Sequence, residues 1–425
     1  RVVGRAPAVG CSRQWMLRVE VDVSEWRPEC RAPLALALRH NDRFMAFKAE
    51  GVPLGSKVGP ALAPMLAANK RLVALSLERV GGVPSDFVAI GQGLAANAES
   101  GLSVIKLSGN QVGDEGAGAL AAGLARLRPG LLAELHLQGC GIGPQGMQTL
   151  LSALLSQRNL LQLHVSGNLL GGVGALAQLI AQAKKLEELS LGGSGADAAT
   201  LASMAPNSLR ALRALDLSGV AWGNALLVVL RAAGDKRATL KLSGGAATLA
   251  SQGKQPFLRQ LLEESASRPK LDLDLSVPQA PSALLPDLLA VLPQAAVPAG
   301  LKLADSQLGD AGLAQLLQAL LPQAAPLRSL DVSSNLPYVP AALDCWSMPE
   351  QHAMQLVDDF ANAAFGSGSI PQAAARWQVQ LQPGMEQVVA LRLASVRGLT
   401  QLLRGAPDLK KLALRGSWTA AAPPS

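Results

Sequence analysis

Leucine and other apolar residues recur along this chain in one short pattern. In residues 101–170 the pattern starts three times, at Leu102, Leu132 and Leu160, with starts 30 and then 28 residues apart. In each copy, further apolar residues follow three and five positions after the first. Apolar residues two positions apart lie on the same face of a β-strand. Each copy therefore predicts a short strand, with room after it for a turn and a helix, such as one over residues 117–127.

The three copies match the template L-x-x-L-x-L-x-x-N/C-x-L, which is the signature of a leucine-rich repeat. Its polar position holds Asn110, Cys140 and Asn168 in turn. One repeat cannot bury its own apolar face, so repeats have to stack on one another. Helices are about twice as wide as the ~4.8 Å spacing of strands, so the stack has to bend toward its strands. The predicted fold class is therefore α/β: a leucine-rich repeat solenoid (horseshoe) with a parallel inner β-sheet and outer helices.

Degenerate copies of the pattern extend the array in both directions. They start at or near Phe44, Leu72, Leu186, Leu212, Leu240, Leu273, Leu301 and Leu327. Between these strands the sequence predicts helices over residues 60–68, from Ser85 as the N-cap to residue 95, and over 311–321. We place the leucine-rich repeats in residues 41–338.

The N-terminal end departs from the repeat. Residues 1–40 are predicted to form a linker and cap, because the terminal unit of a solenoid needs cover. An alternating run within residues 15–30 predicts an edge strand, and residues 32–39 predict a helix.

After residue 338 the repeat spacing is interrupted. Apolar residues at 388, 391 and 393 predict the next strand, and those at 409, 412 and 414 predict a last one. The predicted segments are an insertion or irregular repeat over 339–386 that contains a helix over 349–365, C-terminal repeats over 387–416, and a disordered tail over 417–425.

Composition narrows the classes of function. The chain has 38 lysine and arginine residues against 31 aspartate and glutamate residues, a net charge of +7. This excess is too mild for a nucleic-acid binder, although from residue 391 onward six basic residues stand against one acidic residue. The four cysteines are scattered without a C-x-x-C pair, which argues against a disulfide framework and a zinc site. A reducing, cytoplasmic location is the expectation.

Two further features bear on the setting of the chain. No run of 18 uncharged apolar residues occurs, so we expect no membrane insertion. The chain begins with Arg1 rather than Met, which is consistent with a fragment of a longer protein. We expect the fragment to be monomeric.

Polar residues between the core leucines are the candidates for a binding face, because they point to the concave side of the predicted sheet. The candidate residues are Lys106, Glu134, His136, His164, Asp216, Lys241, Asp274, Lys302, Asp331 and Arg392. Both charge signs alternate along this series, which fits a protein partner better than a polyanion such as nucleic acid.

Two histidines occupy the same position in adjacent repeats. His136 and His164 are therefore predicted to be neighbours, and Glu134 lies one pleat away, so a metal site is one interpretation. No third strong ligand follows at Ser190, and the favoured interpretation is a pair of exposed polar residues on a binding face.

Two other patterns have chemical and structural interpretations. Residues 171–174 read G-G-x-G before a helix, like a phosphate cradle, but they lack the Lys and Ser/Thr of a P-loop, and a structural turn is favoured. His352 with Asp358 and Asp359 could supply an acid or base, but a solvated helix face is favoured. No Ser/His/Asp or Cys/His arrangement occurs. We therefore predict neither an enzyme nor a cofactor.

One stretch, residues 41–154, resembles the repeat domain of the CARMIL family, the actin capping-protein regulators. The shared landmarks are L-G-S at 54–56, N-K-R-L at 69–72, S-D-F at 85–87, S-G-L at 100–102, L-S-G-N at 107–110 with Asp114 and Gly116, R-P-G-L at 128–131 and I-x-P-x-G at 142–146. The resemblance implies a cytoplasmic scaffold with actin-regulatory protein partners. It does not carry over inhibition of capping protein, which resides in a basic tail after the family's repeats.

The predicted function is a non-enzymatic protein–protein interaction scaffold linked to the actin cytoskeleton. Leucine-rich repeat adaptors or sensors of another kind, such as immune-type receptor repeats or ciliary scaffolds, remain the alternative. A Ran-type GTPase-activating protein is less favoured, because such proteins usually end in an acidic tail and this chain ends in a basic one.

Overall fold

The structure is a computed structural model of the whole chain. It describes residues 19–22, 24, 44–54, 58–170, 173–196, 209, 212–220, 223–232, 239–243, 254–268, 271–276, 284–335, 350–366, 368–377 and 386–414. The chain divides into two compact units, which we describe separately. Unit 1 contains Arg1–Val220 and Val228–Ala238, and unit 2 contains Ala221–Leu227 and Thr239–Ser425.

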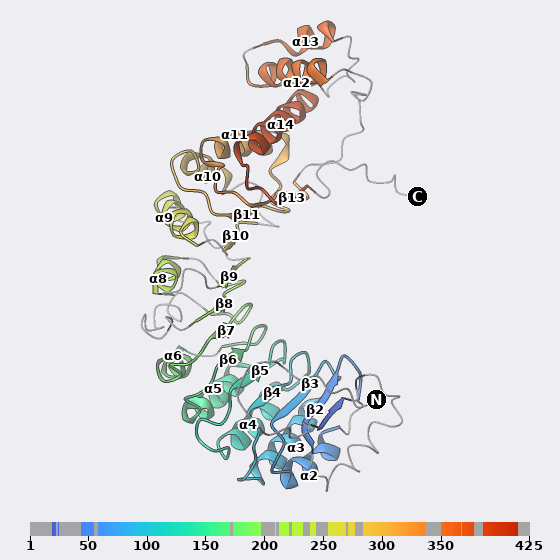
Figure 1. Cartoon of the computed structure of the whole chain (residues 1–425), viewed down its shortest axis with the longest axis vertical. Helices are drawn as coiled ribbons and strands as arrows, with labels where there is room; N and C mark the ends of the chain where they lie inside the picture. Colours follow the sequence, from blue (N-terminus) through green and yellow to red (C-terminus); the bar gives the residue numbers. More distant parts are fainter. Residues whose placement is uncertain are drawn as a thin grey trace, which may run out of the picture. The chain divides into compact units, whose positions relative to one another are not determined.

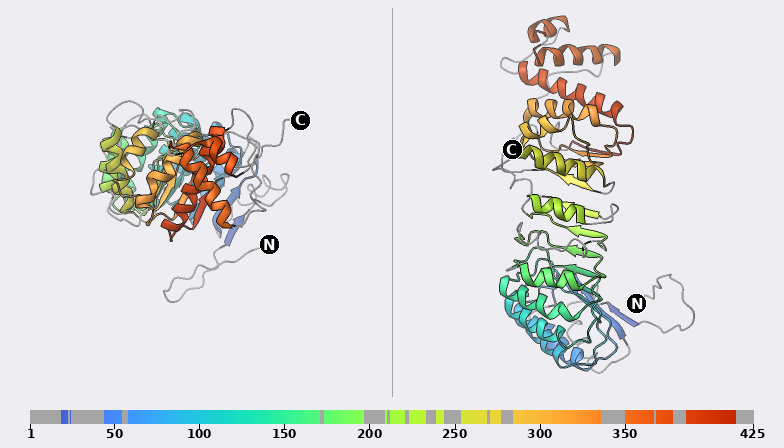
Figure 2. Two further views of the ribbon diagram at one scale, coloured as in Figure 1. Left: turned by 90° about the horizontal axis from the view of Figure 1, so that it is seen from above. Right: turned by 90° about the vertical axis from the view of Figure 1, so that its left-hand side faces the viewer.

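Unit 1 is built from parallel strands that pair in sequence order (Figure 1). The strands are β1 (Val19–Asp22), β2 (Phe44–Glu50), β3 (Ala74–Glu78), β4 (Val104–Lys106), β5 (Glu134–His136), β6 (Gln162–His164), β7 (Glu188–Ser190) and β8 (Ala214–Asp216). The helices are α2 (Val58–Ala68), α3 (Pro84–Ala95), α4 (Gly113–Leu124), α5 (Pro144–Ala153) with a 3-10 turn at Leu154–Ser156, and α6 (Val173–Gln182). They cover one face of the strands, and none of the helices described in unit 1 covers the other (Figure 2).

The leucine pattern forms the core of unit 1, as predicted. In the copy that contains β4, the side chains of Leu102, Ile105 and Leu107 are fully buried. The residues between them are half-buried on the opposite face of the strand, which is the alternation expected of a sheet with one covered face. The predicted α/β class with a parallel sheet is confirmed.

The asparagine position of the template joins one repeat to the next. Asn168 is buried, and its Oδ1 accepts hydrogen bonds from the backbone N–H groups of Cys140 and Ile142, both at 3.0 Å. Its Nδ2 donates to the carbonyls of Leu137, at 2.6 Å, and Val165, at 3.0 Å. One side chain thus satisfies four backbone groups from two neighbouring repeats.

The same bridge recurs at other copies of the template, but one copy lacks it. Asn110 and Asn335 make equivalent bonds, each to carbonyls of its own repeat and of the repeat before. In the copy after Asn168, Ser194 occupies this position, and its buried hydroxyl has no hydrogen-bond partner among the described residues. Serine is too short to bridge the repeats, so this link is absent at β7.

Unit 2 continues with parallel strands in sequence order. The strands are β9 (Thr239–Leu242), β10 (Asp272–Asp274), β11 (Gly300–Lys302), β12 (Ser329–Asp331) and β13 (Lys411–Ala413). The helices are α9 (Lys254–Ala266), α10 (Leu285–Val291), α11 (Gly309–Leu320) with a 3-10 turn at Leu321–Gln323, α12 (Glu350–Ala364), α13 (Ile370–Arg376) and α14 (Glu386–Gly405). Helix α8 (Asn224–Ala232) crosses the division between the units.

The strand predicted over residues 388–393 is wrong. These residues lie inside helix α14, which runs without a break from Glu386 to Gly405. Its buried residues include Ala390, Ala394, Gly398 and Leu402, which recur every four residues, near the helical period rather than the strand period. The strand that pairs with β12 is instead β13, at the last predicted copy of the pattern.

Several local predictions can be compared with the described residues. The helices predicted over 60–68, 311–321 and 349–365 are confirmed within two residues. The edge strand near the N-terminus is confirmed as β1, which pairs in parallel with β2. The helix predicted over 32–39 and the tail 417–425 lie outside the described residues.

Two helix starts differ from the prediction. Helix α4 begins at Gly113, four residues before the expected start at residue 117. Helix α3 is capped at Val83 rather than at Ser85, and Pro84 opens the helix. The capping side chain is Asp86, whose carboxylate accepts hydrogen bonds from the N–H groups of Val83 and Gly59. A proline that has no N–H to donate is well suited to the first helical position.

Candidate protein-binding face

Two rows of side chains run across the uncovered face of β4–β8. In strand register they contain Val104, Glu134, Gln162, Glu188 and Ala214 in one row and Lys106, His136, His164, Ser190 and Asp216 in the other. We call this surface the strand face. It holds five of the ten residues that the sequence predicted for a binding face, and the shared repeat position brings them together.

Charged and polar side chains contact one another across the first half of the strand face, on β4–β6. Lys106 Nζ lies 3.2 Å from Glu134 Oε2, and His136 Nε2 lies 4.0 Å from the same oxygen. His136 Nε2 is also 3.2 Å from Gln162 Oε1, which favours a proton on that ring nitrogen. Lys106 thus supplies a permanent positive charge beside Glu134.

The two histidines stack at the centre of the strand face. The ring centroids of His136 and His164 are 4.3 Å apart and the rings are 14° from parallel. Burial lowers the pKa of His136, and the nearby His164 and Lys106 lower it further. A metal ion lies in the plane of each imidazole that binds it, so two stacked rings cannot share one ion. The described residues contain no group of three side chains suited to hold a metal.

The second half of the strand face ends in carboxylates. His164 Nε2 lies 3.3 Å from Glu188 Oε2, but this approach is not a hydrogen bond, and Nε2 is buried without a hydrogen-bond partner in the described structure. The Ser190 hydroxyl lies 3.3 Å from Asp216 Oδ2 and is also hydrogen-bonded to the Ser166 hydroxyl. Polar contacts thus extend from β4 to β8.

Three of the predicted aspartates have a structural role that the sequence analysis missed. Asp216, Asp274 and Asp331 each accept a hydrogen bond at 3.0 Å from the backbone N–H two residues later, at Ser218, Ser276 and Ser333. This is the geometry of an Asx turn, which closes the bend after the strand. The recurring sequence D-x-S was the signal for it.

The predicted residues in unit 2 do not form one row. Asp274, Lys302 and Asp331 are in register with one another on β10–β12. Lys241 pairs instead with Asp272, two positions away from the expected row. Arg392 is not on a strand at all: it lies on α14, where Nε donates to Asp310 Oδ1 of α11 at 2.6 Å. Its assignment to the binding face is wrong.

Sequence reasoning also passed over two strand-face residues, Gln162 and Glu188, and over Gln138, which follows β5. Gln138 Nε2 lies 3.4 Å from His164 Nδ1, so it helps to fix the orientation of that ring. Glu188 stands in the same row as Glu134, and this shared position was the signal that could have found it.

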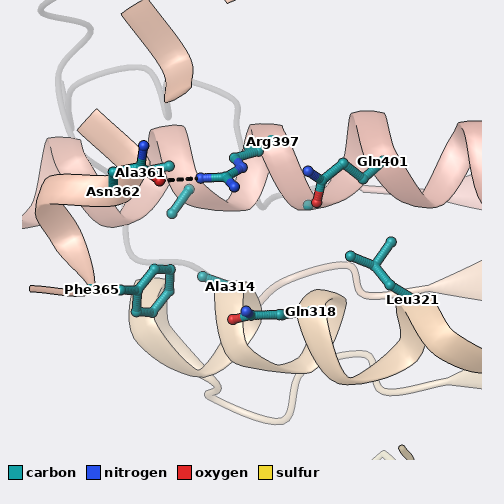
Figure 3. A pocket seen from close by; sticks show the side chains of 10 residues that line it. Ala314, Gln318, Leu321, Ala361, Asn362, Phe365, Arg397 and Gln401 are labelled. Carbon is teal, nitrogen blue, oxygen red and sulfur yellow. Dashed lines mark hydrogen bonds between the residues drawn. The ribbon is translucent and has the colours of Figure 1, made fainter. Parts of the chain in front are cut away.

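A cavity of about 240 Å³ lies among α11, α12 and α14 in unit 2 (Figure 3). Its lining includes Gln318, Phe365, Gln401 and the charged residue Arg397. The Arg397 guanidinium donates to Asn362 Oδ1 at 2.7 Å and lies 3.3 Å from Asp358. Because this charge is satisfied within the unit, the cavity is a weaker candidate for recognising a charged partner than the strand face.

The acidic pair on α12 connects helices. Asp359 accepts a hydrogen bond from Trp377 Nε1 at 2.8 Å and lies 2.9 Å from Arg376 of α13. Such contacts fit the structural interpretation better than an acid or base. The glycine-rich turn at 171–174 lies partly outside the described residues.

Comparison with known proteins supports the repeat interpretation. A family model described as "Leucine Rich repeat" matches residues 102–121 and 131–151. These segments are leucine-rich repeats. The match covers β4 and β5 with the helices that follow them, so it includes the part of the strand face that holds Lys106, Glu134 and His136.

Two curated relatives carry repeats of this kind within longer chains. NACHT, LRR and PYD domains-containing protein 5 from Bos taurus is 29% identical over 249 residues, which is 59% of this chain and 20% of the bovine protein. The Homo sapiens protein of the same name is 35% identical over 120 residues, 28% of this chain and 10% of that protein. Among solved structures, an internalin from Listeria monocytogenes has a TM-score of 0.34 at 16% identity, covering 68% of this chain and 74% of that one. The comparisons do not support the CARMIL family specifically.

Among the helices that the structure describes, none is both long and apolar enough to cross a membrane.

We predict that acid weakens the leucine-rich repeats of unit 1 through His136. Its pKa is lowered in the native state, so between the two pKa values the unfolded chain holds more protons, and the free energy of unfolding rises with pH. This contribution is complete above the ordinary histidine pKa of 6.5 and is lost as the pH falls below it. Urea unfolding midpoints at about pH 7.5 and about pH 5.5 bracket this range and test the prediction.

The matched control is His352→Gln, which removes an exposed histidine on α12. The His136→Gln variant is expected to lose less stability on acidification than the wild-type chain, and the control variant to lose as much as the wild type. Equal acid sensitivity of the wild type and His136→Gln would refute the prediction.

Proposed function

We propose that this chain is a protein-interaction scaffold without catalytic activity, and that the strand face of β4–β8 is where it holds a protein partner. A cytoplasmic location, expected from the cysteine usage, belongs to the same proposal. The observation that carries it is a polar network across five strands that stays open to solvent. The side chains of Lys106, Glu134 and Glu188 are 31%, 27% and 38% exposed. Half-buried groups of this kind are already ordered, so a partner loses little conformational freedom in binding them.

The chemistry of the strand face favours a protein over a nucleic acid. Lys106 is paired with Glu134, and the other end of the network is acidic at Glu188 and Asp216. A polyanion gains its affinity from many unpaired lysines and arginines, which this surface does not offer. Complementary charges on a protein partner would instead fix its register and speed its association.

A second candidate is a sensor or adaptor of the kind that carries repeats beside signalling domains. It is favoured by the similarity over 249 residues to a protein whose name also includes NACHT and PYD domains. The actin-linked function implied by the CARMIL resemblance remains a third possibility, supported by the landmarks in residues 41–154 alone. Each candidate uses the repeats as a binding platform, and the identity of the captured partner distinguishes them.

Affinity purification with paired variants tests the proposal. The His136→Asp/His164→Asp variant places two negative charges on the strand face, and we expect it to lose about 90% of the specific partner by quantitative mass spectrometry. The control variant Gln148→Asp/Gln182→Asp adds the same charge on exposed positions of α5 and α6. It is expected to keep the partner.

Circular dichroism of both variants establishes that they fold. If the aspartate pair unfolds the repeats, His136→Gln/His164→Gln serves as the milder strand-face variant. A folded strand-face variant that captures every wild-type partner undiminished would rule out the strand face as the binding site.

A further inference from the structure

Carboxylates of unit 1 differ in whether a permanent cation lies beside them. Glu50 lies 3.2 Å from Lys48, Glu134 lies 3.2 Å from Lys106, and Glu187 lies 3.1 Å from Arg213. These carboxylates each have a permanent cation, and their negative charge is largely compensated before any partner arrives.

Glu188 and Asp216 are not balanced in this way. Within the described part of the chain, neither has a lysine or arginine nitrogen within 4.0 Å. Among the described residues, the only ionisable group beside Glu188 is His164, and Asp216 is held by the Ser190 hydroxyl and the Ser218 N–H. Serine and backbone donors orient a carboxylate without neutralising it. The end of the strand face at β7 and β8 therefore carries uncompensated negative charge, on a chain whose net charge is +7.

His164 does not balance Glu188 with a permanent positive charge. Its ring stacks on the ring of His136, with 4.3 Å between the centroids. The buried Nε2 of His164 forms no hydrogen bond with Glu188 despite its 3.3 Å approach.

We propose that the strand face at β6–β8 binds a basic segment of a partner protein, with a lysine or arginine side chain held between Glu188 and Asp216. This inference rests on the proposed binding role of the strand face and names the chemistry of its partner. The two residues stand on neighbouring strands, which are spaced about 4.8 Å apart, and they are offset by two residues along the strand direction. A guanidinium or ammonium group can contact both, and an acidic segment would be repelled by the same pair.

Proton binding supplies a specific signature for this site. A proton on His136 adds positive charge to the ring that stacks on His164, and His164 Nε2 lies 3.3 Å from Glu188. The charged groups that face the histidine pair are Lys106 on β4, Glu134 on β5, Glu188 on β7 and, through Ser190, Asp216 on β8. Since protonation of His136 adds positive charge to this end, affinity for a basic segment falls as the pH falls.

Binding of a labelled oligolysine peptide to the full chain, followed by fluorescence anisotropy, tests the proposal. Glu188→Gln and Asp216→Asn keep the shape of the side chains, and asparagine can still close the Asx turn. We expect each variant to weaken oligolysine binding about tenfold. The control Glu115→Gln removes an equal charge from an exposed position in the first turn of α4 and is expected to change binding less than about twofold. An oligoglutamate peptide is expected not to bind.

Comparison of about pH 7.5 with about pH 5.5 completes the test. Wild-type affinity for oligolysine is expected to fall on acidification, and to fall less in His136→Gln. Oligolysine binding that responds equally to Glu188→Gln and Glu115→Gln, or that is absent altogether, overturns the basic-partner proposal. If the strand-face aspartate pair nevertheless abolishes capture of the cellular partner, the proposed function stands and only the chemistry assigned to the partner is wrong.

Discussion

Replacing Asn168 by alanine is expected to lower the free energy of unfolding of unit 1 by about 3 kcal/mol. The substitution removes the hydrogen bonds that one buried side chain makes with the backbone of two repeats. Each buried N–H or carbonyl left without a partner costs about 1 kcal/mol or more, because water cannot reach it. Stability in a repeat array depends on links between neighbours, so the loss falls on the junction between β5 and β6.

Asn159 offers a matched control in the same unit. Its side chain donates to the Gly130 carbonyl at 2.9 Å, but this hydrogen bond is exposed, and Asn159→Ala should cost less than about 1 kcal/mol. Asn168→Cys should be less damaging than alanine, because Cys140 already occupies this template position with its thiol 3.4 Å from the Leu107 carbonyl. Urea unfolding and amide exchange at Cys140 and Ile142 measure these effects. Equal losses in Asn168→Ala and Asn159→Ala would contradict the prediction.

The position of Asn168 shows which parts of the fold can be predicted from the sequence. Buried leucines and the asparagine bridge have to recur at a fixed spacing, because each repeat meets its neighbours in the same way. Periodicity therefore predicts strand positions, burial and the neighbourhood of His136 and His164, all of which the structure confirms. It predicts them best where the spacing is regular.

Prediction failed where apolar spacing fits two structures at once. Within α14, residues 388, 391 and 393 match the strand template, but buried residues four apart, at 390, 394, 398 and 402, fit a helix that is 20 residues long. The longer helical pattern prevails, because its whole apolar side can be buried against other helices. In β9 the template lacks a leading leucine, and the register with β10 is shifted by two residues from the expected one.

The candidate site was predictable in its backbone positions but not in its contacts. Register follows from the repeat, so Lys106, His136 and His164 had to be neighbours. The pairing of Glu134 with Lys106, and the lack of such a cation at Glu188, depend on side-chain geometry that the repeat length does not determine. These differences in charge balance, rather than the row of residues itself, give the strand face its acidic end.

An aspartate in the first turn of a helix, within the sequence G-D, occurs in both units but binds different partners. Asp114 in the first turn of α4 accepts hydrogen bonds from Gly143 N at 2.7 Å and Gly146 N at 3.0 Å, at the start of α5. Asp310 stands at the matching position of α11, in the shared sequence G-D, but its partner is the guanidinium of Arg392 on α14. A charged side chain thus replaces the backbone N–H groups of a following repeat.

Removal of that guanidinium is expected to destabilise unit 2 strongly. The side chain of Asp310 is only 8% exposed and that of Arg392 17%. Arg392→Leu leaves a buried carboxylate without its cation, and we expect a loss of about 3 kcal/mol in the free energy of unfolding. The control Arg404→Leu, on the exposed last turn of the same helix, should cost less than about 0.5 kcal/mol.

A second substitution distinguishes the contribution of the Arg392–Asp310 ion pair from that of apolar packing between α14 and α11. In the Arg392→Leu background, Asp310→Asn removes the uncompensated charge, and we expect it to restore about 1 kcal/mol or more, although in the wild-type chain the same change should be destabilising. Chemical unfolding of the four chains completes the double-mutant cycle. Additive losses would mean that the two side chains do not act as a pair, and that α14 is held on α11 by its apolar residues alone.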